Sequence, residues 1–133
     1  IEKLDTQVGV DGWDILFTDQ DTKNSYGQYV PCTGFAWRPN VNVTDPSRFA
    51  ARTVISSEFR KIGARFGAYS MIVRRSGMKK ILDFLKTNHI FLPYDIEFPY
   101  PEDIRLFTVL DDIVSTWPNS PSDNGAPNYK DKR

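Results

Sequence analysis

Short apolar runs separated by polar, glycine-rich and proline-rich segments predict a domain built mainly of strands, with one regular helix. Runs of this kind, rich in β-branched and aromatic residues and bounded by turn residues, are typical of strands. They lie at residues 14–18, 35–38, 64–73, 105–109 and 113–117. Residues 53–62 are expected to be extended or mixed. Residues 77–87 place apolar side chains at helical spacing with lysines on the other face, which predicts a helix with Ser76 as its N-cap.

The segment after this helix carries two carboxylates. Pro93 disfavours a helical conformation at the residue before it. We therefore expect an extended segment that carries Asp95 and Glu97 away from the sheet. Because alternate residues of an extended chain share a face, both side chains are expected on the same side.

The domain organisation follows from length and from the composition of the C-terminus. The 133 residues fit one small domain. We expect a single α/β domain over residues 1–117. Residues 118–133, rich in Pro, Ser, Asn, Asp and Lys, are expected to form a flexible tail.

Charge and hydropathy exclude several classes of partner. Basic and acidic residues number 17 each, so no net field draws the chain to nucleic acid or to an anionic membrane. No apolar run approaches the roughly 18 residues needed for a transmembrane segment. The single cysteine, Cys32, cannot form an internal disulfide, which favours a reducing compartment and a cytoplasmic location.

Three stretches together resemble one known family. Residues 13–17 read Trp-Asp-Ile-Leu-Phe, residues 67–70 read Gly-Ala-Tyr-Ser and continue through Ser76 and Gly77 into a helix, and residues 93–95 read Pro-Tyr-Asp. A Ser-Asp pair follows at residues 122–123. This combination resembles the C-terminal half of glycosyltransferase family 25, which includes lipopolysaccharide sugar transferases and procollagen galactosyltransferases.

The resemblance implies a fold and an activity. The expected fold is the Rossmann-like α/β fold called GT-A, and the expected role is in a pathway such as lipopolysaccharide biosynthesis. The reaction would transfer a hexose from a nucleotide sugar, most simply a UDP-linked one, to a hydroxyl of a glycan or lipid-linked acceptor. The family carries a metal-binding Glu-Asp-Asp cluster upstream of the Trp-Asp motif. This chain lacks that sequence and begins at Ile1 without an initiator Met, so we expect an incomplete or truncated domain.

Asp95 is the expected catalytic residue. Inverting sugar transfer needs a carboxylate that accepts the proton of the acceptor hydroxyl. The resemblance and this chemistry both indicate Asp95, with Glu97 as a second carboxylate that shares acceptor binding or replaces it. The alternative is that both are surface carboxylates of a loop.

Asp19 and Asp21 are the candidate metal ligands. An apolar strand followed by Asp-x-Asp is a common way to hold Mn²⁺ or Mg²⁺, because both ions prefer oxygen ligands and bridge a diphosphate. The alternative is an ordinary turn, since Asp is a frequent turn residue after a strand. The resemblance argues for the turn, because the family's metal cluster lies upstream.

A basic stretch provides the candidate donor-binding residues. No acidic residue occurs between Glu58 and Asp83, and we expect Arg65, Arg74 and Arg75 to contact the donor diphosphate. A nucleic-acid surface and a merely solvated helix face are the alternatives. A further class remains open, namely a non-catalytic module that uses this basic patch to bind an anionic glycan or a partner protein.

Overall fold

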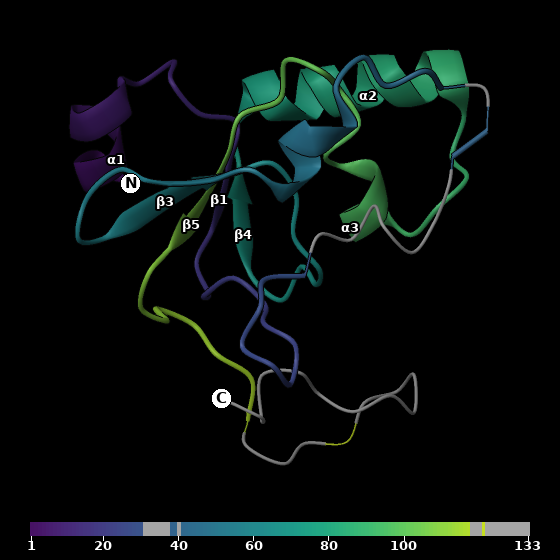
Figure 1. The fold of residues 1–133 in the computed structure, drawn as a ribbon. Coiled ribbons are helices and arrows are strands. Elements are labelled where there is room, and N and C mark those ends of the chain that lie inside the picture. Colours follow the sequence, from purple (N-terminus) through teal and green to yellow (C-terminus); the bar gives the residue numbers. More distant parts are fainter. Residues whose placement is uncertain (31–37, 40, 118–120, 122–133) are drawn as a thin grey trace.

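The molecule is a small α/β domain in which two main helices, α1 and α2, lie against a mixed five-stranded sheet (Figure 1). The computed structural model describes residues 1–30, 38–39, 41–117 and 121. The strands are β1 (Ile15–Phe17), β2 (Arg52–Val54), β3 (Phe59–Ile62), β4 (Met71–Val73) and β5 (Leu106–Val109). The helices are α1 (Glu2–Val8), the 3₁₀ helix η2 (Pro46–Ala50), α2 (Arg75–Asn88) and α3 (Tyr94–Glu97).

The strand order β2-β3-β5-β1-β4 places one parallel pair in the sheet. β1 and β5 run parallel, with Phe17 opposite Thr108, and the other neighbours are antiparallel. β1 and β5 therefore end at the same edge of the sheet, which we call the carboxyl edge. β3 begins there, since Phe59 pairs with Val109, and so does β4, since Met71 pairs with Phe17.

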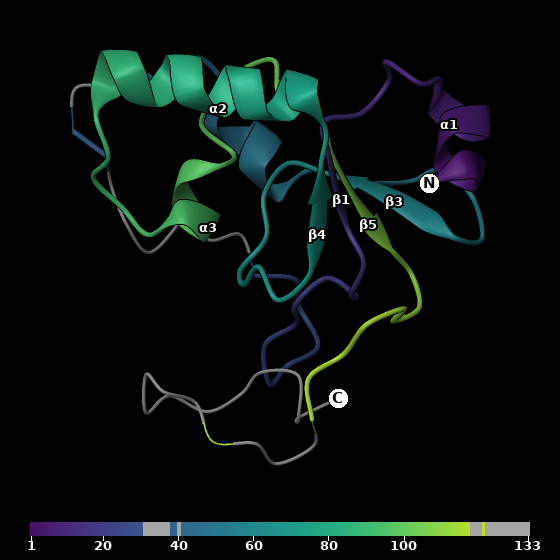
Figure 2. The same ribbon diagram turned by 180° about the vertical axis from the view of Figure 1, so that it is seen from behind.

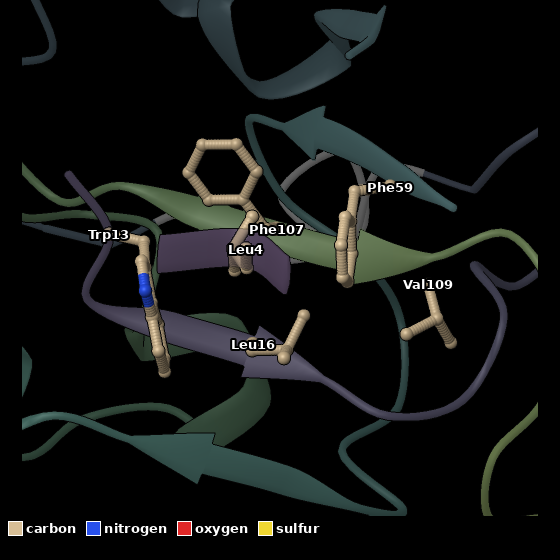
Figure 3. Close-up of a cluster of buried hydrophobic side chains, with 6 residues drawn as sticks. All are labelled: Leu4, Trp13, Leu16, Phe59, Phe107 and Val109. Carbon is tan, nitrogen blue, oxygen red and sulfur yellow. The ribbon is translucent and has the colours of Figure 1, made fainter. Parts of the chain in front are cut away.

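Apolar side chains fill both faces of the sheet. One cluster, shown in Figure 3, joins α1 to the sheet and comprises Leu4, Trp13, Leu16, Phe59, Phe107 and Val109. Because successive strand residues point to opposite faces, Ile15 and Phe17 lie on the other face, where Ile81 of α2 packs against them. A third cluster, around Phe49 of η2 and Ile96 of α3, extends the core beyond the sheet.

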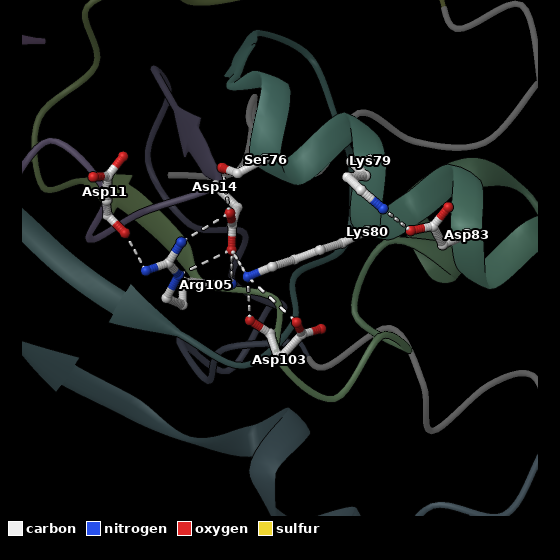
Figure 4. Close-up of polar contacts among 8 residues, drawn as sticks. All are labelled: Asp11, Asp14, Ser76, Lys79, Lys80, Asp83, Asp103 and Arg105. Atoms are coloured by element: carbon white, nitrogen blue, oxygen red, sulfur yellow. Dashed lines mark hydrogen bonds and ion pairs between the residues drawn. The ribbon is translucent and has the colours of Figure 1, made fainter.

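A buried carboxylate anchors α2 to the sheet (Figure 4). Asp14 is fully buried immediately before β1 and accepts hydrogen bonds from the Ser76 hydroxyl at 2.7 Å and Lys80 Nζ at 2.8 Å, both on α2. It also accepts from the backbone N–H and side chain of Arg105, which precedes β5. A Cβ at Gly77 would lie 2.8 Å from the Asp14 carbonyl oxygen, so only glycine lets the helix approach this closely. In Figure 2, α2 lies across one end of the sheet, and α3 lies below α2.

The predictions made from the strongest patterns are confirmed. The apolar runs at 14–18 and 105–109 contain β1 and β5, and the predicted helix is α2. The α/β class is therefore confirmed. The N-cap prediction is wrong, because Arg74 occupies that position and Ser76 instead donates to Asp14. Residues 53–62, expected to be extended or mixed, contain β3 and all of β2 except Arg52, and the two strands pair antiparallel.

Two strand predictions are wrong, those for residues 64–73 and 113–117. Of the run at 64–73, only Met71–Val73 forms a strand, because Gly67 has a φ of +86° and the chain before β4 loops away from the sheet. Residues 113–117 form no strand. Their first two N–H groups, those of Ile113 and Val114, both donate to the Thr18 carbonyl.

The segment after Pro93 is helical instead of extended. Pro93 is the N-cap of α3, where its fixed φ suits a helix start and its missing N–H costs nothing. The proline constrains the residue before it, not the residues after it.

Some predictions lie outside the described residues. These are the Ser-Asp pair at 122–123, Cys32, residues 35–37 of the strand expected at 35–38 and, apart from residue 121, the tail at 118–133; Arg38 itself is described and lies in no strand. Among the helices that are described, none combines the length and hydrophobicity needed to cross a bilayer.

Candidate functional site

The candidate site lies at the carboxyl edge. In open α/β sheets, ligands bind outside the carboxyl ends of parallel strands. The chain leaving β1 lies here against the loop formed by residues 65–70, which we call the Gly67 loop. Thr18 bonds to Ser70 through both its N–H, at 3.1 Å, and its hydroxyl, at 2.7 Å. The Thr22 hydroxyl donates to the Phe66 carbonyl at 2.6 Å, so the two segments form one unit.

Asp19 and Arg65 form a buried ion pair at the centre of this unit. Arg65 Nη2 donates to Asp19 Oδ2 at 2.6 Å, and both side chains are almost completely buried. Arg65 Nη1 and the Thr108 hydroxyl both donate to the Asp19 carbonyl oxygen. The guanidinium also lies 4.6 Å from the ring centroid of Phe17. Arg65 is therefore held inside the fold by Asp19, and its contact with the donor stays a prediction.

Asp21 has a second arginine partner. Arg52 Nε donates to Asp21 Oδ2 at 2.6 Å. The other two guanidinium nitrogens donate to the carbonyl oxygens of Phe49, Ala51 and Ala64. Burial raises the pKa of Asp21 above its ordinary value, and the charges of Arg52 and Arg65 offset this only in part. Asp21 Oδ1 is buried and accepts no hydrogen bond from the described residues.

This donor set does not fit a divalent cation held by protein side chains alone. The described residues contain no group of three or more His, Cys, Asp or Glu side chains arranged around one point. Arginines already neutralise Asp19 and Asp21. Metal binding by these two residues stays a prediction, and no step proposed below depends on it.

Asp95 is connected to this network through Gly67. The Gly67 N–H donates to Asp95 Oδ2 at 3.2 Å, and the Gly67 carbonyl accepts from Arg65 Nε at 3.0 Å. Gly67 thus contacts both Asp95 and Arg65, and Arg65 in turn pairs with Asp19. Asp95 is half-buried, unlike the fully buried Asp19. The structure therefore brings three of the residues expected to form the site into one network.

Glu97 has a different environment. It is buried, its Oε1 accepts the N–H groups of Phe91 and Leu92, and its Oε2 lies 3.1 Å from Arg38 Nε. The expectation that Glu97 shares a face with Asp95 is wrong, because residues two apart on a helix are about 200° apart around its axis. These contacts make Glu97 a residue that closes the loop between α2 and α3.

The structure separates Arg74 and Arg75 from Arg65. β4 runs antiparallel to β1, so both residues follow β4 at the sheet edge opposite the carboxyl edge. Arg74 is ion-paired with Asp5, and its guanidinium lies 4.1 Å from the ring centroid of Trp13. The hydrogen bond from Trp13, together with Arg74, lowers the pKa of Asp5. Arg75 is exposed at the start of α2. The three arginines expected to bind one donor therefore do not share a site.

Two groups of residues come together in the structure in a way that the sequence does not predict. Asp14 lies within the Trp-Asp-Ile-Leu-Phe run, and a charged residue in a buried strand was the available signal for a polar network. The second group is Lys23, Tyr29 and Arg60, which border a cavity beside Asp21. These residues are separated by up to 37 positions, and no local pattern predicts that they meet.

Comparisons with known proteins leave the family unassigned. No family model matches the chain, and neither the curated proteins nor the solved structures include a significant match.

Proposed function

We propose that this domain binds a nucleotide sugar at the carboxyl edge and transfers its hexose to a hydroxyl of a glycan or lipid-linked acceptor, in the manner of a GT-A glycosyltransferase. One observation carries the proposal: the Asp95 carboxylate is tied through Gly67 to the Arg65–Asp19 pair, at the edge where α/β sheets bind ligands. The resemblance to family 25 indicates the same carboxylate.

The proposed chemistry assigns Asp95 the role of general base. The acceptor oxygen attacks the anomeric carbon, the bond from that carbon to the diphosphate oxygen breaks, and the nucleoside diphosphate leaves. The hydroxyl proton passes to Asp95. The hydrogen bond from the Gly67 N–H restricts the orientation of the carboxylate, and a fixed orientation is what such a base requires.

Replacing Asp95 with asparagine should lower turnover by roughly 10²–10⁴-fold, the usual scale for one positioned base. The amide keeps the shape of the side chain but cannot accept the proton, so donor affinity should change little. Release of UDP from a UDP-hexose in the presence of an acceptor measures turnover, and calorimetry measures donor affinity.

Asp11→Asn is the matched control for Asp95→Asn. The Asp11 side chain is exposed, and the residue precedes β1 at the far end from the carboxyl edge. We expect turnover of this variant to equal that of the unmodified chain. Equal turnover of all three proteins would remove Asp95 from the mechanism. A chain that neither binds a UDP-hexose nor releases UDP would contradict the proposed function.

A non-catalytic module that binds an anionic glycan or a partner protein is the second candidate. The position of Arg75 favours it, because this exposed arginine lies away from the carboxyl edge at the start of α2, the helix that also exposes Lys79. Such a module would bind an anionic glycan without any turnover. Arg75→Gln would then weaken binding, and Asp95→Asn would not.

A further inference from the structure

A small cavity opens at the carboxyl edge beside the Asp19–Asp21 segment. Its volume is about 230 Å³. It is lined by Gln20, Asp21, Lys23, Tyr29, Arg60, Val109 and Leu110. The cavity lies where the chain leaves β1 and β5, and Arg60 of β3 borders it because Arg60 pairs with Thr108 near the end of β5.

Three cations surround the ring of Tyr29. The guanidinium carbon of Arg60 lies 4.4 Å from the ring centroid, Lys23 Nζ lies 5.0 Å from it, and the guanidinium carbon of Arg52 lies 5.7 Å from it. Arg52 is paired with Asp21. Lys23 and Arg60 form no ion pair with any carboxylate in the described part of the chain, so the cavity has an excess of positive charge.

Local structure fixes the backbone that carries these groups before any ligand arrives. Lys23 and Tyr29 pair as an antiparallel β-bridge. Between them, Asn24 Oδ1 accepts the N–H groups of Tyr26 and Gln28, and Gly27 has a φ of +76° that suits the turn. Arg60 lies on a strand that pairs on both sides. Groups that are already positioned lose little entropy when they bind a ligand.

We propose that this cavity binds a phosphate or diphosphate group, with Lys23 and Arg60 donating charge-assisted hydrogen bonds to its oxygens. Ligand pockets for drug-sized molecules measure about 300–1,000 Å³, so the smaller volume favours a compact anion. Arg52 offsets the charge of Asp21, which leaves the attraction of Lys23 and Arg60 uncancelled. The Gln20 N–H donates to Asp112 Oδ1 at 2.7 Å and is not part of the anion site.

The source of the phosphate is a separate question. Free phosphate, pyrophosphate and a nucleotide present the same oxygens to Lys23 and Arg60. Identifying the ligand as the diphosphate of a nucleotide-sugar donor rests on the proposed function above. Titrations with phosphate, pyrophosphate, uridine and UDP distinguish these sources, because uridine lacks the anion and the other three carry it.

The test is calorimetric titration of the full chain with pyrophosphate, followed by the variants Lys23→Gln, Arg60→Gln and their combination. We expect each single change to weaken binding about tenfold or more, as loss of a charge-assisted hydrogen bond does, and the combination to abolish it. Lys61→Gln is the matched control: it removes the same charge from the same strand, but Lys61 points to the other face of the sheet and is exposed. This variant should bind like the unmodified chain.

Two results would overturn the assignment. One is an unmodified chain that binds no pyrophosphate, and the other is a double variant that binds it normally. Arg60→Lys keeps the charge and should retain most of the affinity, which separates loss of charge from loss of folding. If pyrophosphate binds as described but no UDP-hexose is turned over, the anion site stands and the transferase proposal fails. If the double variant loses pyrophosphate binding but transfer proceeds normally, the transferase proposal stands and the cavity is not the site of the donor diphosphate.

Discussion

Replacing Arg65 with methionine is expected to destabilise the fold by about 3–5 kcal/mol, the usual cost of breaking a buried ion pair by removing one partner. Methionine leaves the Asp19 carboxylate buried without its guanidinium partner. It also removes the Arg65 donors to the carbonyl oxygens of Gly67 and Asp19, and the Asp19 carbonyl keeps only the Thr108 hydroxyl of the two donors described above. Urea denaturation followed by circular dichroism measures the loss in the free energy of unfolding.

Two variants control this experiment. The double variant Asp19→Leu with Arg65→Met removes both charges and should recover much of the stability, because apolar replacements for a buried pair are often nearly neutral. Arg74→Gln breaks the more exposed pair with Asp5 and should lower the free energy of unfolding much less than Arg65→Met does. An Arg65→Met variant as stable as the unmodified chain would show that this pair does not hold the carboxyl edge together.

Replacing Asp14 with asparagine is expected to lower the free energy of unfolding by about 3 kcal/mol at neutral pH. This is the lower end of the range for a buried ion pair, because the side chains of Lys80 and Arg105 are partly exposed. Asp14 joins α2 to the starts of β1 and β5, and asparagine removes the carboxylate that Lys80 and Arg105 share, leaving Lys80 only its longer contact with Asp103. Asp83→Asn, which breaks an exposed pair with Lys79, should change stability very little.

The loss of stability caused by Asp14→Asn should become smaller as the pH falls. Burial alone would raise the pKa of Asp14, but hydrogen bonds from Arg105, Lys80 and Ser76 outweigh it and hold the pKa well below its ordinary value. The stabilisation is therefore complete above the unfolded-state pKa of about 3.9 and is lost as the pH falls toward the lower folded-state value. Unfolding curves at neutral and acidic pH should show the two proteins becoming more similar in acid. A difference that grows in acid would contradict this assignment.

The elements whose apolar residues recur at a regular spacing were predictable from the sequence. α2 and the central strands follow directly from apolar spacing, because those residues face the core along a regular element. α3 was missed because Pro93 reads equally well as the end of an extended segment and as the start of a helix. The loop before β4 was missed because its conformation depends on Arg65 reaching Asp19, 46 residues away in the chain.

The candidate site was only partly predictable, for a related reason. Asp19, Arg65 and Asp95 were all identified by residue type and position, and the structure connects them. Arg74 and Arg75 were grouped with Arg65 because they are near it in sequence. The antiparallel pairing of β4 with β1 then places them at the opposite edge. Strand direction depends on long-range pairing, which a local run of basic residues does not encode.

Mapping of amide chemical shifts during titration with a UDP-hexose tests the central claim most directly, namely that the carboxyl edge is the donor-binding surface. We expect the shifts to concentrate in the segment after β1, from Thr18 to Lys23, and in the Gly67 loop. The amides at the start of α2, around Arg75, should remain unperturbed. Shifts centred on Arg75, or no shifts at saturating ligand, would contradict the account.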